Sequence, residues 1–310
     1  MLQSCWQISS KVILLPIRYV ICIFINKQVD IYSLAKLELI ISSFLTEDSF
    51  PMVDYFDEVF VVKSPNKWYS SLYEMFSAYV FLRHKHIDYV TTCNLALVSH
   101  LFILNYLSDS KKILIEDGLM NYFLFKPSQR ISKRLVKFLF GIKENKVLNS
   151  ICKTYLLKPD DAVYFYGKKE KIVLDKNDFL GKLDVDYCFK NKKVFVGQPF
   201  YNTGIISIED YNNLVNNIIK RFNIDYYLPH RVASKDENIS CPILDLTNSK
   251  ATLEVYASYF EFELYGFSSS VLYSTKCINP NIKTYVIDNS FVDKKAQEFI
   301  NHYVDSVIKV

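Results

Sequence analysis

The sequence predicts an α/β protein made of two open domains, each built around a parallel β-sheet. Short runs of β-branched and aromatic residues alternate with stretches of helical spacing through most of the chain, a pattern typical of βαβ units. The length of 310 residues suits two domains of ordinary size better than one core. A charged stretch over residues 158–178 interrupts the alternation. We therefore place a domain boundary near residue 160, which gives domains 1–160 and 161–310.

The first element is the apolar window over residues 12–26, which contains Pro16 and Arg18. It is shorter than the ~20 apolar residues of a membrane-spanning helix. It also lacks the earlier basic region and the small-residue cleavage site of a secretory signal. We expect two buried strand-like segments, 12–16 and 19–25, in a cytoplasmic protein. Peripheral contact with the inner face of the cell membrane is the alternative.

The later elements follow the same alternation. Strand-like runs are found over 58–62, 89–92, 112–116, 194–197, 226–229 and 283–287. Helical spacing is found over 70–82, 96–107, 211–222 and 252–260, and a helical stretch over 293–308 closes the chain. Right-handed crossovers place the carboxyl ends of such strands along one edge of each sheet, where ligands usually bind. Candidate site residues are therefore expected where a strand ends.

Charge and cysteine content exclude several classes of protein. The 37 Lys and Arg residues against 33 Asp and Glu give a net charge of +4, which is weak for a dedicated duplex-DNA binder. No nucleic-acid partner is expected. The seven cysteines are odd in number and form no Cys-x-x-Cys pair, which favours reduced thiols over a disulfide framework or a zinc site. A basic cluster over 130–137 fits a solvated helix face or, alternatively, contact with an acidic polymer or a lipid surface.

The stretch Ile113–Leu119 is an apolar strand that ends in two carboxylates and a glycine. Glycine occurs only seven times in the chain, so Gly118 indicates a sharp backbone turn. A carboxylate at a strand end can accept a proton from a hydroxyl nucleophile. Glu116 and Asp117 are therefore candidate general bases, and an Asp-Gly turn between two elements is the alternative.

Three stretches of the second half also hold candidate residues, and the first two lie at the ends of strand-like runs. They comprise Gly197 and Gln198; Pro229, His230 and Arg231; and Gly266, Ser268, Ser269 and Ser270. A histidine beside a fixed cation can donate a proton or pair with a phosphate. A serine run before an apolar run is typical of a helix N-terminus, where hydroxyls and N–H groups bind anions. A structural histidine and a simple helix cap are the alternatives.

Together and in this order, these stretches resemble the bacterial sialyltransferases of glycosyltransferase family 52, which make sialylated lipooligosaccharides and capsular polysaccharides. The matching letters are IEDGL at 115–119, VGQP at 196–199, YYLPHR at 226–231 and GFSSSVL at 266–272, followed by NPNIKTYVI at 279–287. Related families share an acidic-acidic-Gly triplet, a His-Pro pair and a Ser-Ser/Thr pair. Here Pro229 precedes His230, the reverse of the family order.

The resemblance implies a GT-B-like fold, in which an N-terminal acceptor-side domain and a C-terminal donor-binding domain, both Rossmann-type, face a central cleft. It implies inverting, metal-independent transfer of sialic acid from CMP-Neu5Ac, without a cofactor, to a terminal galactose of a lipid-linked surface glycan, through an α-2,3 bond. Peripheral membrane contact and a homodimer are compatible with it. Carried over by position, the base is Asp117, slightly favoured over Glu116. His230, Ser269 and Ser270 then hold the leaving phosphate.

Three alternatives remain open at the level of the sequence. The first is a related transferase of another nucleotide sugar. The second is a non-catalytic nucleotide-sugar-binding protein of the same fold. The third is a membrane-associated component of capsule assembly. No metal ligands are expected, because the one Asp-x-Asp match, Asp184 and Asp186, lies in a charged, linker-like region.

Overall fold

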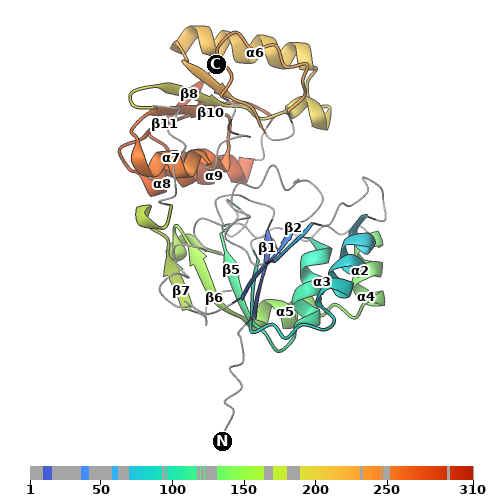
Figure 1. Ribbon diagram of the computed structural model, residues 1–310. Helices are drawn as coiled ribbons and strands as arrows, with labels where there is room; N and C mark the ends of the chain where they lie inside the picture. The colour runs from blue at the N-terminus through green and yellow to red at the C-terminus, as the bar shows by residue number, and fades with distance from the viewer. Residues whose placement is uncertain are drawn as a thin grey trace, which may run out of the picture. The chain divides into compact units, whose positions relative to one another are not determined.

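The chain divides into two units, Met1–Leu174 and Asp175–Val310, each with one parallel sheet (Figure 1). The computed structural model describes residues 10–15, 36–41, 58–61, 70–92, 95, 97–116, 119, 122, 131–163, 170–179, 189–230, 233–244, 246, 252–291 and 294–309. The first unit extends past the boundary that we expected near residue 160. It does so because β7 (Glu170–Val173) pairs with β6 (Ile151–Leu156), which places the charged stretch partly inside the first sheet.

The sheet of the first unit has the order β3-β2-β1-β4-β5-β6-β7. Its other strands are β1 (Ser10–Leu15), β2 (Lys36–Ile41), β3 (Glu58–Val61), β4 (Tyr89–Thr92) and β5 (Lys111–Ile115). The order 3-2-1-4-5-6 is that of a doubly wound Rossmann sheet, which changes winding direction between β1 and β4. The strand expected over 12–16 is present as β1, whereas 19–25 lies outside the described residues.

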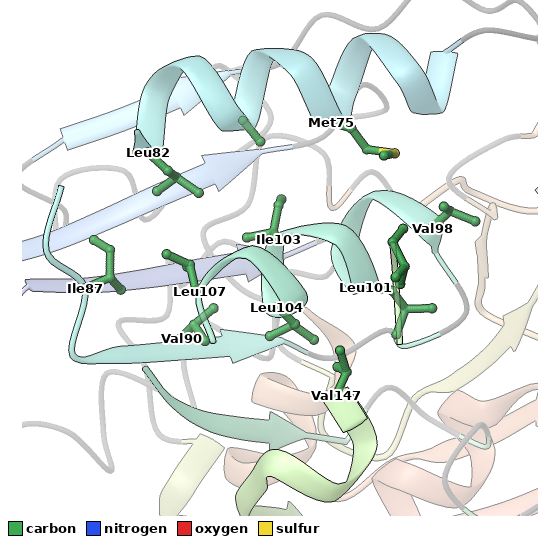
Figure 2. Close-up of a cluster of buried hydrophobic side chains, with 12 residues drawn as sticks. Met75, Leu82, Ile87, Val90, Val98, Leu101, Ile103, Leu104, Leu107 and Val147 are labelled. Carbon is green, nitrogen blue, oxygen red and sulfur yellow. The ribbon is translucent and has the colours of Figure 1, made fainter. Parts of the chain in front are cut away.

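Four helices of the first unit pack together beside this sheet (Figure 1). They are α2 (Ser70–Leu82), α3 (Val98–Tyr106), α4 (Ile131–Leu139) and α5 (Glu144–Ser150). Figure 2 shows the core between them, where Met75 of α2, Leu104 of α3 and Val147 of α5 are buried. Each such side chain contributes about 1.5–3 kcal/mol through burial, so Leu104→Ala is expected to cost about 2–5 kcal/mol.

The sheet of the second unit has the order β12-β11-β10-β8-β9. The strands are β8 (Lys193–Val196), β9 (Tyr226–Leu228), β10 (Glu263–Gly266), β11 (Lys283–Asp288) and β12 (Ser306–Lys309). With the five strands numbered in chain order from β8, the order read from the β9 edge is 2-1-3-4-5, the other common doubly wound arrangement. Winding therefore reverses between β8 and β10. Helix α6 covers one face of this sheet, and α7, α8 and α9 lie on the other (Figure 1).

The helices of the second unit are α6 (Ile208–Phe222), α7 (Leu253–Tyr259), α8 (Ser270–Ile278) and α9 (Lys294–Tyr303). Helix α6 begins three residues before its expected start because Ser207 caps it. The hydroxyl of Ser207 accepts the N–H of Asp210 at 3.0 Å. The helix ends at Asn223, whose left-handed φ of 51° is tolerated by asparagine.

The last element differs from the prediction. The helix expected over 293–308 ends at Tyr303, and β12 pairs in parallel with β11. The β-branched pair Val307 and Ile308 favours a strand, and pairing with the sheet edge outweighs the helical spacing. Strands β2, β6, β7 and β10 were also not predicted. Within the described residues, no helix combines the length and the apolar character needed to cross a membrane.

Candidate functional site

Three neighbouring strands of the second unit end in one row. Val196 of β8 pairs with both Leu228 of β9 and Gly266 of β10, and the N–H of Gly197 donates to the carbonyl of Leu228 at 2.9 Å. Adjacent strands are about 4.8 Å apart, so the two outer strand ends flank β8 at a total width of about 10 Å. The row coincides with the reversal of winding between β8 and β10, the place where open α/β sheets bind ligands.

Gln198 and Ser268 follow the ends of β8 and β10 in this row, and each has a buried side-chain oxygen without a hydrogen-bond partner among the described residues. The side-chain amide of Gln198 donates to the carbonyl of Ser268 at 3.4 Å. Among the described residues, the Gln198 Oε1 and the Ser268 Oγ are buried and have no hydrogen-bond partner. A buried oxygen without a partner carries a desolvation cost, and such atoms at a strand edge are suited to receive donors of a ligand.

The serine run begins helix α8, as the sequence predicts. Ser269 is the N-cap residue, and its hydroxyl accepts the N–H of Val271 at 3.4 Å. Ser270 is the first helical residue and is partly exposed. The positive end of the helix dipole therefore lies directly beside the ends of β8 and β10. This arrangement is suited to a phosphate group.

The two glycines of the strand row have different surroundings. A Cβ at Gly197 would overlap the hydroxyl and the ring of Tyr227, so any larger residue would displace that tyrosine. A Cβ at Gly266 would lie 3.3 Å from the carbonyl of Val196, a tighter but less severe contact. Gly197 is therefore required by the packing of Tyr227 beneath the strand end.

A partly buried polar network anchors the segment that follows β9, and the sequence analysis did not predict it. Glu237 accepts hydrogen bonds from the hydroxyls of Tyr201 at 2.6 Å and Tyr227 at 2.9 Å. Tyr227 in turn contacts the hydroxyl of Tyr211 at 2.9 Å, and Tyr211 accepts the N–H of Gln198 at 3.0 Å. One carboxylate thus links the loop after β9 to the end of β8. No spacing or composition signal distinguishes Glu237 from other loop acids.

Burial also raises the pKa values of the three tyrosines in this network. Desolvation, together with the hydrogen bond to Glu237, raises the pKa of Tyr201 to about 12. Burial raises the pKa of Tyr211 and of Tyr227 well above the ordinary value. All three therefore remain protonated at neutral pH, and Glu237 is the shared acceptor of Tyr201 and Tyr227.

His230 lies two residues after the end of β9, in a half-buried turn. Its carbonyl accepts the N–H of Ala233 at 2.8 Å, and the N–H of Ser234 donates to the hydroxyl of Tyr201 at 2.8 Å. Pro229 lies between the strand and this turn, whereas Arg231 is outside the described residues. The turn that begins at His230 is therefore connected to the tyrosine network through Ser234 and Tyr201.

In the first unit, Glu116 follows β5 and is fully buried. Its Oε2 accepts the N–H of Leu157 at 2.6 Å and the hydroxyl of Tyr122 at 2.5 Å. The Tyr122 hydroxyl also accepts the N–H of Lys158 at 3.2 Å. Glu116 thus links the end of β5 to the segment that follows β6. The next two residues in the sequence, Asp117 and Gly118, which are also predicted site residues, lie outside the described residues.

No group of three His, Cys, Asp or Glu side chains placed to hold a metal ion is found in the described part of the chain. Asp184 and Asp186, the sequence match for such a site, lie outside that part.

Comparisons with solved structures define the class of fold. The chain is similar to a sialyltransferase from Photobacterium damsela, with 13% identity, a TM-score of 0.56 and coverage of 97% of this chain and 81% of that one. It is similar to S. aureus MnaA in its UDP co-structure, with 11% identity, a TM-score of 0.58 and coverage of 96% and 83%. It is also similar to the spinosyn rhamnosyltransferase SpnG complexed with thymidine diphosphate, with 11% identity, a TM-score of 0.52 and coverage of 97% of this chain and 86% of that one. The fold is therefore GT-B-like, with two Rossmann-type domains.

The family model for glycosyltransferase family 52 matches residues 54–290, which is most of the chain. No curated protein matches the sequence. The chain belongs to glycosyltransferase family 52, as the order of the four sequence stretches predicts.

Proposed function

We propose that this protein is an inverting, metal-independent sialyltransferase that moves sialic acid from CMP-Neu5Ac to a terminal galactose of a bacterial surface glycan, through an α-2,3 bond. The acceptor is lipid-linked, of the lipooligosaccharide or capsule type. Membership of family 52 and the fold shared with the Photobacterium sialyltransferase support the activity. The proposal places the protein at the cytoplasmic face of the membrane where such acceptors are built.

One observation carries the donor assignment: the unpartnered Gln198 Oε1 and Ser268 Oγ lie at the reversal of winding, beside the capped start of α8. Two solved structures of similar fold were determined with nucleoside diphosphates, UDP and thymidine diphosphate, which supports a nucleotide sugar as the ligand. We assign the phosphate to Ser269, Ser270 and the first N–H groups of α8. His230 approaches the same row from β9.

The carboxylates of the first unit take different roles in this proposal. The Oε2 of Glu116 is buried and already accepts two hydrogen bonds, which is typical of a group that positions its neighbours. Asp117, the next residue, is then the general base.

The chemistry follows from where charge develops. The acceptor hydroxyl oxygen forms a bond to the anomeric carbon of sialic acid, and the bond from that carbon to the CMP phosphate oxygen breaks. The hydroxyl proton passes to the Asp117 carboxylate. Negative charge grows on the departing phosphate, where His230, the serine hydroxyls and the α8 N–H groups stabilise it. These groups supply what a divalent ion would otherwise supply.

Isothermal titration with CMP, UDP and thymidine diphosphate tests the donor assignment. We expect CMP to bind in the presence of EDTA, with a lower dissociation constant than either diphosphate. Binding of UDP in preference to CMP would instead support the first alternative, a related transferase of another sugar, which the MnaA–UDP likeness favours. Binding of CMP that disappears in EDTA and returns with manganese would contradict metal independence.

A further inference from the structure

The first unit carries an exposed aromatic and aliphatic surface over three helices. Phe76 of α2 is 67% exposed and Phe138 of α4 is 82% exposed. Other large apolar side chains on the same helices and just beyond α4 are also exposed, namely Tyr73, Tyr79, Val80, Tyr106, Leu135, Leu139 and Phe140. We call this set the aromatic surface. Monomeric proteins rarely expose apolar groups in such number side by side.

Ring contacts connect the α2 and α3 parts of the aromatic surface to Phe140, just after α4. Tyr79 of α2 lies edge-on to Tyr106 of α3 at 5.4 Å between ring centroids. Tyr106 stacks with Phe102 at 6.3 Å, and Phe102 lies edge-on to Phe140, just after α4, at 5.8 Å. The surface therefore crosses from α2 over α3 to α4 without a polar interruption between these rings.

In helix α4, exposed apolar side chains lie on a different side of the helix from the residue that packs into the core. Val136 packs against the core of the unit. At 3.6 residues per turn, Phe138 lies roughly 160° around the helix from Val136. Leu135 lies about 60° from Phe138 and about 100° from Val136, and both Leu135 and Leu139 are exposed. The helix thus directs a second apolar side away from its own core.

The charges beside this surface identify its partner. Residues 131–146 contain five Lys and Arg residues against one acid, Glu144, and Glu144 is paired with Lys137 at 2.5 Å. Two copies of the chain meeting through the same face would place these cations opposite one another. An anionic lipid surface complements both the cations and the apolar side chains, as in interfacial basic helices.

We propose that the aromatic surface, with Lys133 and Arg134, docks on an anionic phospholipid bilayer. The side chains of Phe138, Leu135 and Leu139 enter the headgroup and acyl boundary, while the cations contact lipid phosphates. This inference does not depend on the donor assignment. It adds to the proposed function a means of holding the enzyme at the surface where a lipid-linked acceptor resides.

Flotation with vesicles, in the absence of donor and acceptor, tests this docking. The full chain is mixed with vesicles of phosphatidylglycerol and phosphatidylcholine, or of phosphatidylcholine alone. We expect binding to the anionic vesicles that weakens as salt rises. Lys133→Gln with Arg134→Gln should lower the partition coefficient about five-fold for each cation removed. Leu135→Ser with Phe138→Ser should lower it at least about tenfold.

The controls lie at the opposite edge of the same unit. Val163 is 53% exposed, against 54% for Leu135, and Lys171 is an exposed cation of β7. Val163→Ser and Lys171→Gln should bind as the unchanged protein does, and every variant should keep its melting temperature. Equal binding to neutral vesicles, or binding that neither pair of changes weakens, would overturn the proposal. A dimer that Phe138→Ser dissociates, without vesicle binding, would assign the surface to a second copy.

Discussion

Under the proposed function, Glu116 and Asp117 have different roles, and substitutions at the two positions should have different effects. Two donors share its buried Oε2. Glu116→Ala leaves the Leu157 N–H and the Tyr122 hydroxyl without this acceptor, which should cost about 1–3 kcal/mol for each group. Asp117→Asn should instead lower kcat by ~10²–10⁴ through loss of the base, with little change in stability.

Melting temperatures and transfer rates of the two variants separate these effects. A stable Glu116→Ala protein as inactive as Asp117→Asn would assign the base to Glu116. Two variants that both keep near-full transfer would remove the base from this pair of residues.

Ser268 gives a second prediction at the residue scale. Its buried Oγ has no partner among the described residues, so Ser268→Ala should leave the melting temperature unchanged or slightly raised. Donor affinity should fall about five- to tenfold, the worth of one hydrogen bond. Ser274 of α8 is the matched control, because its buried hydroxyl donates to Glu254 at 3.1 Å.

Ser274→Ala should therefore lower stability and leave donor affinity unchanged. The pair is compared by calorimetric titration of CMP and by thermal unfolding. A Ser268→Ala protein that melts earlier but binds CMP normally would show that this hydroxyl is structural.

Residue types at strand ends were predictable, whereas their partners were not. The sequence placed Gln198 and Ser269 where β8 ends and α8 begins because strand ends and N-caps follow local rules. The link from Gln198 through Tyr211 and Tyr227 to Glu237 joins residues up to 39 positions apart. Such a link depends on tertiary packing and leaves no periodic signal.

At the scale of elements, the Glu237 network holds the turn that carries His230 against the end of β8. Glu237→Ala removes the acceptor of Tyr201 and Tyr227 and should raise the donor KM more than tenfold. Asp236, an exposed neighbour that accepts the hydroxyl of Ser234 at 3.0 Å, is the control. Asp236→Ala should change stability by no more than about 0.5 kcal/mol.

Steady-state kinetics well below the melting temperature distinguishes positioning from folding. A Glu237→Ala protein with a normal donor KM and only a lower melting temperature would limit the network to stability. Recovery of the KM in Glu237→Gln, which keeps one acceptor oxygen, is expected to be partial.

The same network predicts a dependence of stability on alkaline pH. The pKa of Tyr201 is raised from 10.0 to about 12 by burial and by the hydrogen bond to Glu237. The folded protein therefore holds this proton more tightly than the unfolded chain. The resulting stability is fully present below pH 10 and is lost as pH rises from 10 through 12.

Tyr201→Phe has no proton to lose, so its melting temperature should fall less steeply over that range. Some slope remains because the pKa values of Tyr211 and Tyr227 are raised as well. Identical slopes for the two proteins would contradict the assigned shift.

Elements with strong local patterns were predicted well. Helix α2 has the predicted bounds, and β4 covers the predicted run. Strand β12 was read as helix because Lys294–Tyr303 carries helical spacing up to its edge and only pairing with β11 ends it. Strand β7 was hidden by its charges, since an edge strand with exposed Glu170 and Lys171 lacks the apolar run of a central strand.

At the scale of the whole molecule, alternation of strands and helices was enough to predict two open α/β units with parallel sheets, and the resemblance to the family added their Rossmann type. The boundary between the units was harder to predict from the sequence. Composition indicated the charged stretch near residue 160, whereas pairing of β7 with β6 places the division after Leu174. The order of four short stretches identified the family, and the family match over 54–290 confirms it. The roles of the two units in acceptor and donor binding stay predictions.

The most direct test is transfer itself. The protein is incubated with CMP-Neu5Ac and lactose in EDTA, and products are identified by mass and linkage analysis, with Asp117→Asn as the control. We expect sialyllactose and CMP in equal amounts, with the control slower by ~10²–10⁴. Absence of sialyllactose from protein that binds CMP and melts cooperatively, under conditions where a known sialyltransferase gives product, would contradict the account.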